Sequence, residues 1–235
     1  MTTFWGIDSC ELSNHIIPNT GNKKLLKHVT DQLGKPDFWG RYIGGNSSCP
    51  NGVLTLSEIK FLHDNGIKIL VIYNGASPSH MIYEQEGIDD ANKAINIATD
   101  LGISYAGHEV IIYLDIEESW TPTPMYLHGW SKTLNNTGVL IPGFYCNTIS
   151  PNFLTSFCAA RLFSDEVDKT VLYTTQPQKT CTNKAQAPSW NPQDPICIPL
   201  VHSDPGVQVW QYSINCLGGF VDLDLMTSFA FDRTF

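Results

Sequence analysis

A strand-like segment in the middle of the sequence ends in carboxylates. Residues 110–120 read Val-Ile-Ile-Tyr-Leu-Asp-Ile-Glu-Glu-Ser-Trp. Side chains alternate along a strand, so Tyr113, Asp115 and Glu117 share one face. In a parallel barrel the carboxyl ends of the strands form the active-site floor, and acids at that point indicate catalysis. Alternatively, Glu117 and Glu118 only begin a solvated loop.

Two more predicted strands repeat this pattern near the two ends of the sequence. Asp8 ends the segment Phe4-Trp-Gly-Ile-Asp8, and Asp222 and Asp224 share a face of the segment 220–225. In a closed barrel the first and last strands are neighbours, so acids from three strands would meet at one rim. Like-charge repulsion raises at least one pKa in such a cluster and places a protonated carboxyl beside ionised ones. Cleavage of a glycosidic bond needs that pair, and divalent-metal binding is the other use of clustered carboxylates.

Aromatic and polar side chains accompany the acids at the strand ends. The flat faces of aromatic rings suit sugar rings, although each ring could instead belong to the core. Arg41 ends the second predicted strand and could bind a rim carboxylate or a substrate group, or form a structural ion pair. The candidate substrate-binding residues are Arg41, Tyr73, Tyr113, Tyr145, Trp210, Gln211 and Asp224.

The elements that must position these residues follow from the hydrophobic pattern. Short apolar runs predict eight strands, at residues 4–8, 37–43, 67–73, 110–117, 139–145, 171–173, 207–212 and 220–225. Helical patterns lie between them, at residues 22–33, 55–65, 88–101, 125–134 and 152–163. The segment Thr55-Leu-Ser-Glu58 is typical of a capping box at a helix start.

Strands and helices alternate in steps of about 30 residues, which predicts parallel pairing through right-handed crossovers. The expected fold class is α/β, with a single closed (β/α)8 TIM-like barrel over residues 1–235. A doubly wound open sheet is the alternative. Residues 174–206 contain six prolines and no helical period, so loops are expected to replace one or two helices in the last third of the barrel.

The composition excludes several classes of function. Lys and Arg number 14 against 23 Asp and Glu, and the net charge of −9 opposes nucleic-acid binding. No segment is long and apolar enough for a membrane span, and the N-terminus lacks a signal-peptide pattern. Only 16% of the residues are charged, a balance that favours an exported protein. Phosphate-loop, dinucleotide, zinc-protease and nucleophile-elbow motifs are absent, so we expect no cofactor. We also expect a monomer.

Seven cysteines, at positions 10, 49, 146, 158, 181, 197 and 216, form no C-x-x-C pair, which excludes structural zinc of that spacing. Their odd number leaves at least one thiol unpaired. Cys181 and Cys197 bracket the proline-rich stretch and could form a disulfide that constrains it. The alternative is that these are buried free thiols.

The order and spacing of short motifs over essentially the whole length carry a family resemblance. These motifs are Gly6-Ile-Asp8, Gly40-Arg-Tyr42, Leu54-Thr-Leu-Ser-Glu58, Gly66-Ile67, Ile72-Tyr73, Gly87-Ile-Asp-Asp-Ala91, Ile112-Tyr-Leu-Asp-Ile-Glu117, Gly143-Phe-Tyr145, Trp210-Gln-Tyr212 and Val221-Asp222. With them the chain resembles the glycoside-hydrolase-like family of bacterial barrel domains, which is related to the family 25 lysozymes.

Family 25 lysozymes are barrels whose acidic pocket cleaves the bond between N-acetylmuramic acid and N-acetylglucosamine. The resemblance implies that Glu117 is the general acid and that Asp115 orients the substrate's acetamido group for attack on the anomeric carbon. It also implies that Asp8 and Asp222 tune the charge and hold the sugar.

We therefore expect an exported glycoside hydrolase that cleaves peptidoglycan or a related N-acetylhexosamine glycan. A carbohydrate-binding barrel without turnover and a metal-dependent hydrolase are the alternatives. Whether residues 174–206 leave the acidic cleft open or cover it bears on the choice between an enzyme and a binding barrel.

Overall fold

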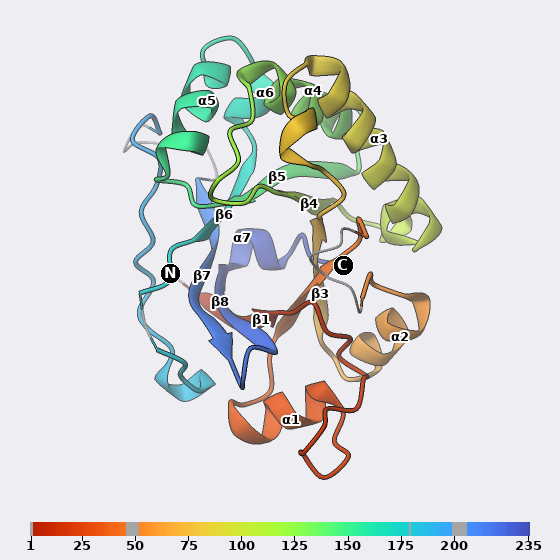
Figure 1. The fold of residues 1–235 in the computed structure, drawn as a ribbon. Coiled ribbons are helices and arrows are strands. Elements are labelled where there is room, and N and C mark those ends of the chain that lie inside the picture. Colours follow the sequence, from red (N-terminus) through yellow and green to blue (C-terminus); the bar gives the residue numbers. More distant parts are fainter. Residues whose placement is uncertain (1, 46–51, 179, 199–205) are drawn as a thin grey trace.

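Eight strands form a closed barrel in sequence order (Figure 1). The computed structural model describes residues 2–45, 52–178, 180–198 and 206–235. All eight predicted strands are present, which confirms the closed α/β barrel. They are β1 (Thr3–Asp8), β2 (Phe38–Tyr42), β3 (Lys68–Tyr73), β4 (Val110–Asp115), β5 (Leu140–Cys146), β6 (Val171–Thr175), β7 (Val207–Cys216) and β8 (Val221–Thr227).

The direction of the last strand differs from the expected parallel arrangement. Neighbouring strands from β1 to β7 are parallel, whereas β8 runs antiparallel to both β7 and β1. Only residues 217–220 connect β7 to β8. A parallel crossover needs about a dozen residues or more, so a connection of this length can only make a hairpin.

Helices follow the first five strands and cover the outside of the barrel (Figure 1). All five predicted helices are present, within a few residues of their expected ends. No α-helix follows β6 or β7 within the described residues, in agreement with the expected irregular last third. The helices are α1 (Leu25–Gln32), α2 (Leu56–Asp64), α3 (Glu84–Asp100), α4 (Pro124–Asn135), α5 (Pro151–Arg161) and the short α6 (Asp165–Asp168) and α7 (Ser228–Phe231).

The alternation of side chains along the strands divides the core into two layers. One layer fills the barrel interior and includes Tyr113 of β4 and Tyr173 of β6. The other layer packs between the strands and the helices and includes Tyr73 of β3 and Trp210 of β7. The face on which a strand residue lies therefore decides whether it can reach the interior.

The C-terminal segment closes the end of the barrel at which β1 to β7 begin, opposite their carboxyl ends. In Figure 1, α7 is seen through the ring of strands. Phe231 of α7 stacks on Phe4 at the start of β1, with 3.7 Å between the ring centroids. Phe235 exchanges two backbone hydrogen bonds with Ile69 near the start of β3. Any opening into the barrel therefore lies at the other end.

Two disulfides fasten the long connection between β6 and β7. Cys158 of α5 is bonded to Cys197, and Cys181 is bonded to Cys216 at the end of β7. The possible pairing of Cys181 with Cys197 is thus wrong, as is the alternative that these two are free thiols, because each is bonded to a cysteine of another element. Cys10 is also disulfide-bonded, and Cys146 is a buried free thiol.

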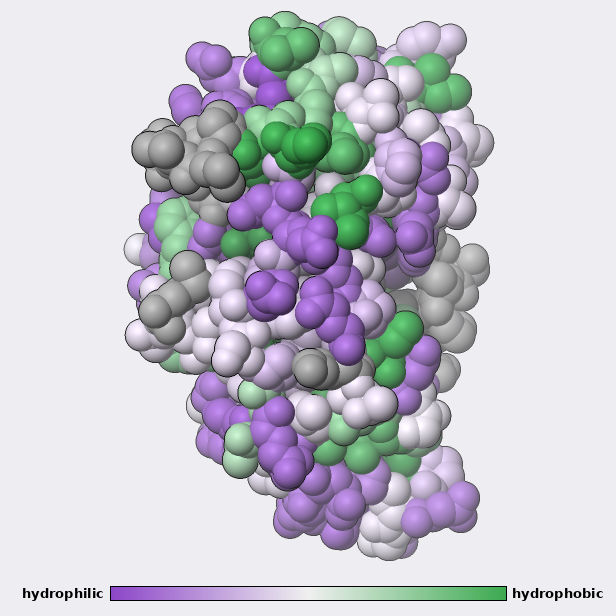
Figure 2. All heavy atoms as spheres, turned by 90° about the vertical axis from the view of Figure 1, so that its left-hand side faces the viewer, coloured by the Kyte–Doolittle hydropathy of each residue, from purple (hydrophilic) through white to green (hydrophobic). Residues whose placement is uncertain are grey.

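The described part of this connection runs down the outside of the barrel from β6 toward α1. Lys184, in a short 3-10 helix, donates its backbone N–H to the Leu33 carbonyl and its Nζ to Asp37. Figure 2 shows hydrophilic and apolar side chains interspersed over this face, with apolar ones more frequent toward the upper end. Among the described residues, no helix is long and apolar enough to cross a membrane.

Candidate active site

Asp8, the last residue of β1, lies at the centre of a hydrogen-bond network inside the barrel. Its Oδ2 accepts from the Tyr173 hydroxyl and from Gln211 Nε2, both at 2.8 Å. Its Oδ1 accepts from the Tyr42 hydroxyl at 3.2 Å. The side chain is only 2% exposed, and burial raises its pKa while the three donors oppose that rise.

Asp222 faces Asp8 across the antiparallel pair of β8 and β1, where the two residues are Cα partners. Gln211 Nε2 lies 3.1 Å from Asp222 Oδ2, so one amide contacts both carboxyls. The backbone N–H of Asn215 donates to Asp222 Oδ1 at 2.6 Å. Burial and the nearby Asp8 raise the pKa of Asp222 to about 7, against the opposing effect of the Asn215 N–H.

Asp115 ends β4 and Glu117 follows it, as the alternation predicts. Asp115 is only 4% exposed, and its Oδ1 is buried without a hydrogen-bond partner. Burial, then Glu117 and Asp8, raise the pKa of Asp115 well above its usual value. Glu117 lies at the solvent-exposed mouth, where partial desolvation still raises the pKa of its carboxyl.

The loop after β4 is anchored in a way that leaves Glu117 available. Asn152 of α5 donates to the Glu118 carbonyl at 3.0 Å, and Asn147 donates to the Glu118 carboxylate at 3.2 Å. The Glu117 carboxyl makes no hydrogen bond to any of the described residues, and only its backbone carbonyl accepts one, from the Trp120 N–H. The two neighbouring glutamates therefore differ, because the Glu118 carboxylate fastens the loop, whereas the Glu117 side chain is exposed and its carboxyl has no partner among the described residues.

Two pockets open at this end of the barrel. One of about 330 Å³ is lined by Asp8, Tyr42, Asn215 and Asp222, together with the loop after β1. The other, of about 230 Å³, is lined by Glu117, Tyr145, Gln211, Ile214 and five more residues. Since the consecutive residues Ile214 and Asn215 each line one pocket, the end of β7 separates the two.

The connection from β6 to β7 contributes only to one wall of this region. Pro177 of this connection lines the smaller pocket together with Thr175, the last residue of β6, and the rest of the described connection lies against other parts of the barrel. The described residues therefore leave both pockets open. A larger cavity, of about 550 Å³, lies between α1 and α2 and is lined by four lysines and none of the predicted site residues.

The predicted residues Tyr113, Tyr145, Gln211 and Asp224 lie with the acids in the barrel interior. Tyr145 stands at the mouth, where its hydroxyl is 3.1 Å from Gln211 Nε2. Tyr113 lies deeper, with its ring edge-on to Tyr173 and its hydroxyl unpartnered. Asp224 is fully buried and contacts the Tyr173 hydroxyl at 2.8 Å.

Arg41, Tyr73 and Trp210 are not brought to the pockets. Tyr73 packs against Trp130 of α4, and Trp210 donates its indole N–H to the Gln176 carbonyl at 2.9 Å. All three side chains lie on the outer face of the barrel and are almost completely buried. Their burial under helices and loops removes them from direct contact with a substrate.

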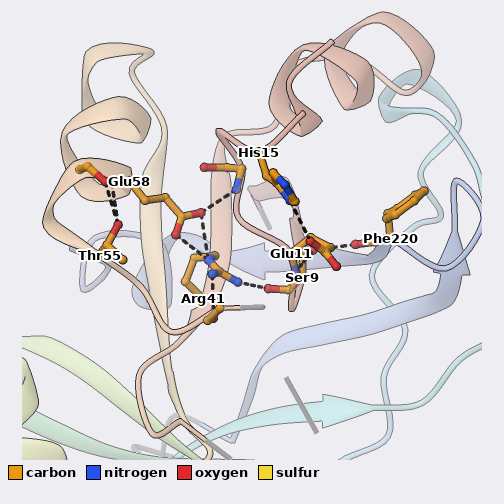
Figure 3. Close-up of polar contacts among 10 residues, drawn as sticks. Ser9, Glu11, His15, Arg41, Thr55, Glu58 and Phe220 are labelled. Atoms are coloured by element: carbon orange, nitrogen blue, oxygen red, sulfur yellow. Dashed lines mark hydrogen bonds and ion pairs between the residues drawn. The ribbon is translucent and has the colours of Figure 1, made fainter. Parts of the chain in front are cut away.

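Arg41 forms the structural ion pair that was the alternative interpretation of its position (Figure 3). Its Nε lies 3.0 Å from the Glu58 carboxylate on α2, and both side chains are fully buried. Its guanidinium also donates to the carbonyls of Ser9 and Gly52. Ser9 lines the pocket that contains Asp8 and Asp222. Arg41 therefore supports that pocket by holding the loop after β1.

Tyr42 and Tyr173 are the interior contacts that sequence reasoning missed. Both hydroxyls donate to Asp8, that of Tyr42 from the neighbouring strand β2 and that of Tyr173 from β6. Alternation along β2 was the available signal, because it places Tyr42 on the face opposite to Arg41. Tyr173 pairs in register with Tyr145, which offered the same signal on β6.

The arrangement of the carboxyls does not fit a metal ion among the described residues. No group of three or more His, Cys, Asp or Glu side chains in this part of the chain is arranged to hold a metal ion. The oxygens of Asp8 instead accept hydrogen bonds from Tyr and Gln side chains. A metal-dependent hydrolase therefore finds no support among these residues.

Comparisons with solved structures agree with the barrel. A protein of unknown function from B. stearothermophilus shares 26% identity and a TM-score of 0.83, covering 99% of this chain and 100% of that one. The Tat-secreted protein Rv2525c of Mycobacterium tuberculosis, solved with L-tartrate, shares 16% identity and a TM-score of 0.55 over 96% of both chains. A family GH25 lysozyme from Aspergillus fumigatus shares 12% identity and a TM-score of 0.52, over 97% of this chain and 95% of that one.

No curated protein sequence matches the chain significantly. The profile of one family, described as Rv2525c-like, glycoside hydrolase-like domain, matches residues 35–217. That range includes Asp115, Glu117, Tyr145 and Gln211, whereas Asp8 and Asp222 lie outside it. As the match spans well over half of the sequence, the chain belongs to the Rv2525c-like, glycoside hydrolase-like domain family.

Proposed function

We propose that this protein is an exported glycoside hydrolase that cleaves peptidoglycan or a related N-acetylhexosamine glycan. The observation that carries the proposal is the pair formed by Glu117 and Asp115 at the open end of the barrel. One carboxyl is exposed and the other almost buried, and both have raised pKa values. Family membership and the fold shared with a lysozyme support the same chemistry.

Glu117 would be the general acid. Its raised pKa keeps a larger fraction of the carboxyl protonated near neutral pH, and its lack of internal partners leaves the proton free for the glycosidic oxygen. When that proton is transferred, the bond between the anomeric carbon and the leaving oxygen breaks, and Glu117 becomes a carboxylate. The same carboxylate can then accept a proton from the water that completes hydrolysis.

Asp115 would orient the substrate's acetamido group. Its carboxyl Oδ1 is buried without a hydrogen-bond partner among the described residues, so the side chain retains unused hydrogen-bonding capacity. The N–H of an N-acetyl group is a donor of matching chemistry. Once held in this way, the acetamido oxygen can attack the anomeric carbon as the leaving group departs.

Asp8, Asp222 and Tyr145 would form the remainder of the sugar site. The two aspartates line the larger pocket beside Glu11, and their negative charge would favour the positive charge that develops on the sugar ring. Tyr145 and Gln211 lie at the boundary with the smaller pocket and would contact the next sugar. Export is supported by the disulfides and by the Tat-secreted relative.

The direct test is release of reducing ends from isolated peptidoglycan by the wild-type protein and by Glu117→Gln. We expect the substitution to lower the rate by about 10² to 10⁴, the contribution of a positioned general acid. Glu118→Gln is the matched control, since Glu118 lines the same pocket but its carboxylate accepts from Asn147 and is not the assigned acid, and it should retain most of the activity. Equal activity in Glu117→Gln and wild type would show that the acid is assigned wrongly.

A binding assay on the same material separates enzyme from binding protein. If wild-type protein releases no reducing ends but sediments saturably with peptidoglycan, the protein is a carbohydrate-binding barrel and the hydrolase proposal fails. If it neither cleaves nor binds peptidoglycan, the substrate class is wrong, and chitin-type N-acetylglucosamine polymers are the next glycans to assay.

A further inference from the structure

The hydroxyl of Tyr173 lies between two buried carboxyls. It is 2.8 Å from Asp8 Oδ2 and 2.8 Å from Asp224 Oδ1. A phenol has one hydrogen to donate, and its oxygen can accept. Burial raises the pKa of Tyr173 well above its usual value, so the phenol keeps that hydrogen. It can therefore donate to only one carboxyl, and the other contact requires a proton on the second carboxyl.

The surroundings of the two carboxyls differ in the donors that they supply. Asp8 accepts from three groups, Tyr42, Tyr173 and Gln211, which together suit an ionised carboxylate. Asp224 contacts only the Tyr173 hydroxyl and the Asp8 carboxyl among the described residues, and its Oδ2 is buried without any hydrogen-bond partner. A carboxylate with one oxygen unsolvated and unbonded is unfavourable in a fully buried position.

We propose that Asp224 is a neutral carboxylic acid that donates to Tyr173, which in turn donates to the ionised Asp8. Asp224 is then a positioning residue that does not touch substrate. It fixes the direction of the Tyr173 O–H bond, and thereby keeps a negative charge on Asp8 at the floor of the larger pocket. This proposal rests on the proposed function, because it assigns a role to the same site.

The electrostatic surroundings agree with this assignment. Burial raises the pKa of Asp224 well above its usual value, and contact with Asp8 raises it further, whereas contact with Asp224 lowers that of Asp8. The charged groups that shift the pKa of Asp224 are the carboxyls of Asp8 and Asp222. The titratable and polar groups that face this chain of hydrogen bonds are Tyr42 on β2, Asp115 on β4, Tyr145 on β5, Gln211 and Tyr212 on β7, and Asp222 on β8.

Infrared difference spectroscopy at pH 7 tests the protonation states without any glycan. Wild type minus Asp224→Asn should contain the C=O stretch of a protonated carboxylic acid. Wild type minus Asp8→Asn should contain carboxylate bands instead. Asp31→Asn is the control, because Asp31 is an exposed carboxylate whose pKa is lowered to about 2 by Lys23 and Lys27. A carboxylate band lost in Asp224→Asn would overturn the proposal.

A second variant covers the case in which Asp224→Asn does not fold. Tyr173→Phe removes only the bridging hydroxyl, so the Asp224 acid loses its acceptor. We expect its C=O stretch to shift to higher frequency while remaining that of a protonated acid. A spectrum with no change among protonated-acid bands would overturn the proposal as well.

The pH dependence of glycan cleavage supplies a readout that a purely structural role would not move. If Asp224 is neutral, Asp224→Leu removes a donor from the chain, raises the pKa of Asp8 and moves the acidic limb of kcat/KM to higher pH. If Asp224 is ionised, the same substitution removes a negative charge and moves that limb to lower pH, which contradicts the proposal. Because the infrared result needs no activity, failure of this proposal is distinguishable from failure of the hydrolase assignment.

Discussion

Asp8 and Asp222 are Cα partners in the antiparallel pair of β1 and β8. The last residue of one strand therefore lies beside the second residue of the other. In an all-parallel barrel the start of β8 would lie at the opposite end, far from the carboxyl end of β1. The hairpin that reverses β8 thus brings Asp222 to the open end of the barrel, where the acids of β1 and β4 are found.

The raised pKa of Asp222 predicts a pH-dependent stability. The folded-state pKa of about 7 exceeds the usual 3.8, so the folded protein binds the proton more tightly than the unfolded chain. Stability from this group is complete below about pH 4 and is lost as pH rises through 7, by at most about 1.4 kcal/mol per pH unit.

Asp222→Asn should make this pH dependence shallower, since the amide does not titrate. The measurement is urea unfolding at pH 5 and pH 7.5 for both proteins. Asp31→Asn is the matched control, because the pKa of Asp31 is lowered to about 2, so this carboxylate is ionised in the folded and unfolded states at both pH values and contributes no pH dependence between them. An unchanged difference between the two pH values in Asp222→Asn would contradict the assigned pKa.

The buried ion pair of Arg41 and Glu58 should be costly to break from one side. Arg41→Met leaves a fully buried carboxylate with the Ser13 N–H as its remaining partner, and we expect a loss of about 3–5 kcal/mol. The double variant Arg41→Met with Glu58→Leu should recover part of that loss, because no charge is left unpaired. Urea unfolding measures both variants, and equal losses in the two would show that the ion pair is not the cause.

Most of the candidate site was predictable because alternation along strands is a local property. The rule that places Tyr113, Asp115 and Glu117 on one face also places Asp222 beside Asp224, and both groups lie inside the barrel. The same rule applied to β2 selects Tyr42 rather than Arg41. The choice of Arg41 followed its charge instead, and its partner Glu58 lies on a helix whose position the sequence does not reveal.

The features that the sequence did not reveal depend on contacts between distant segments. The partner of Cys181 is decided by the path of the connection over β7, which has no periodic pattern. The bridge from Asp8 through Tyr173 to Asp224 joins three strands, and it exists only after the barrel has closed. The direction of β8 was the exception, since the seven residues between the predicted strands 207–212 and 220–225 already exclude a parallel crossover.

Gly40 should be required for the position of Asp8. A Cβ on Gly40 would lie 2.5 Å from the Cβ of Asp8, a contact that can be relieved only by moving β1 or β2. We expect Gly40→Ala to lower stability by about 1–3 kcal/mol and to reduce glycan cleavage sharply.

Gly107→Ala provides the comparison for Gly40→Ala. Gly107 has a φ of +81° and no atom within 4 Å of a built Cβ, so alanine there costs backbone strain alone. Thermal unfolding and reducing-end release on both variants separate the two effects. If Gly107→Ala impairs cleavage as much as Gly40→Ala, displacement of Asp8 is not the reason.

The disulfide between Cys181 and Cys216 should influence the site as well as stability. Cys216 follows Asn215, whose backbone N–H donates to Asp222 and lowers its pKa. Replacing both cysteines by alanine should cost about 2–4 kcal/mol and loosen this end of β7. As the Asn215 contact weakens, the pKa of Asp222 should rise, and the loss of stability with increasing pH should move to higher pH.

The matched control replaces Cys158 and Cys197, which enclose a chain segment of similar length, 39 residues against 35, but fasten α5. That control should lose similar stability with the Asp222 titration unchanged, and a shift of equal size in both variants would show that the end of β7 does not control Asp222.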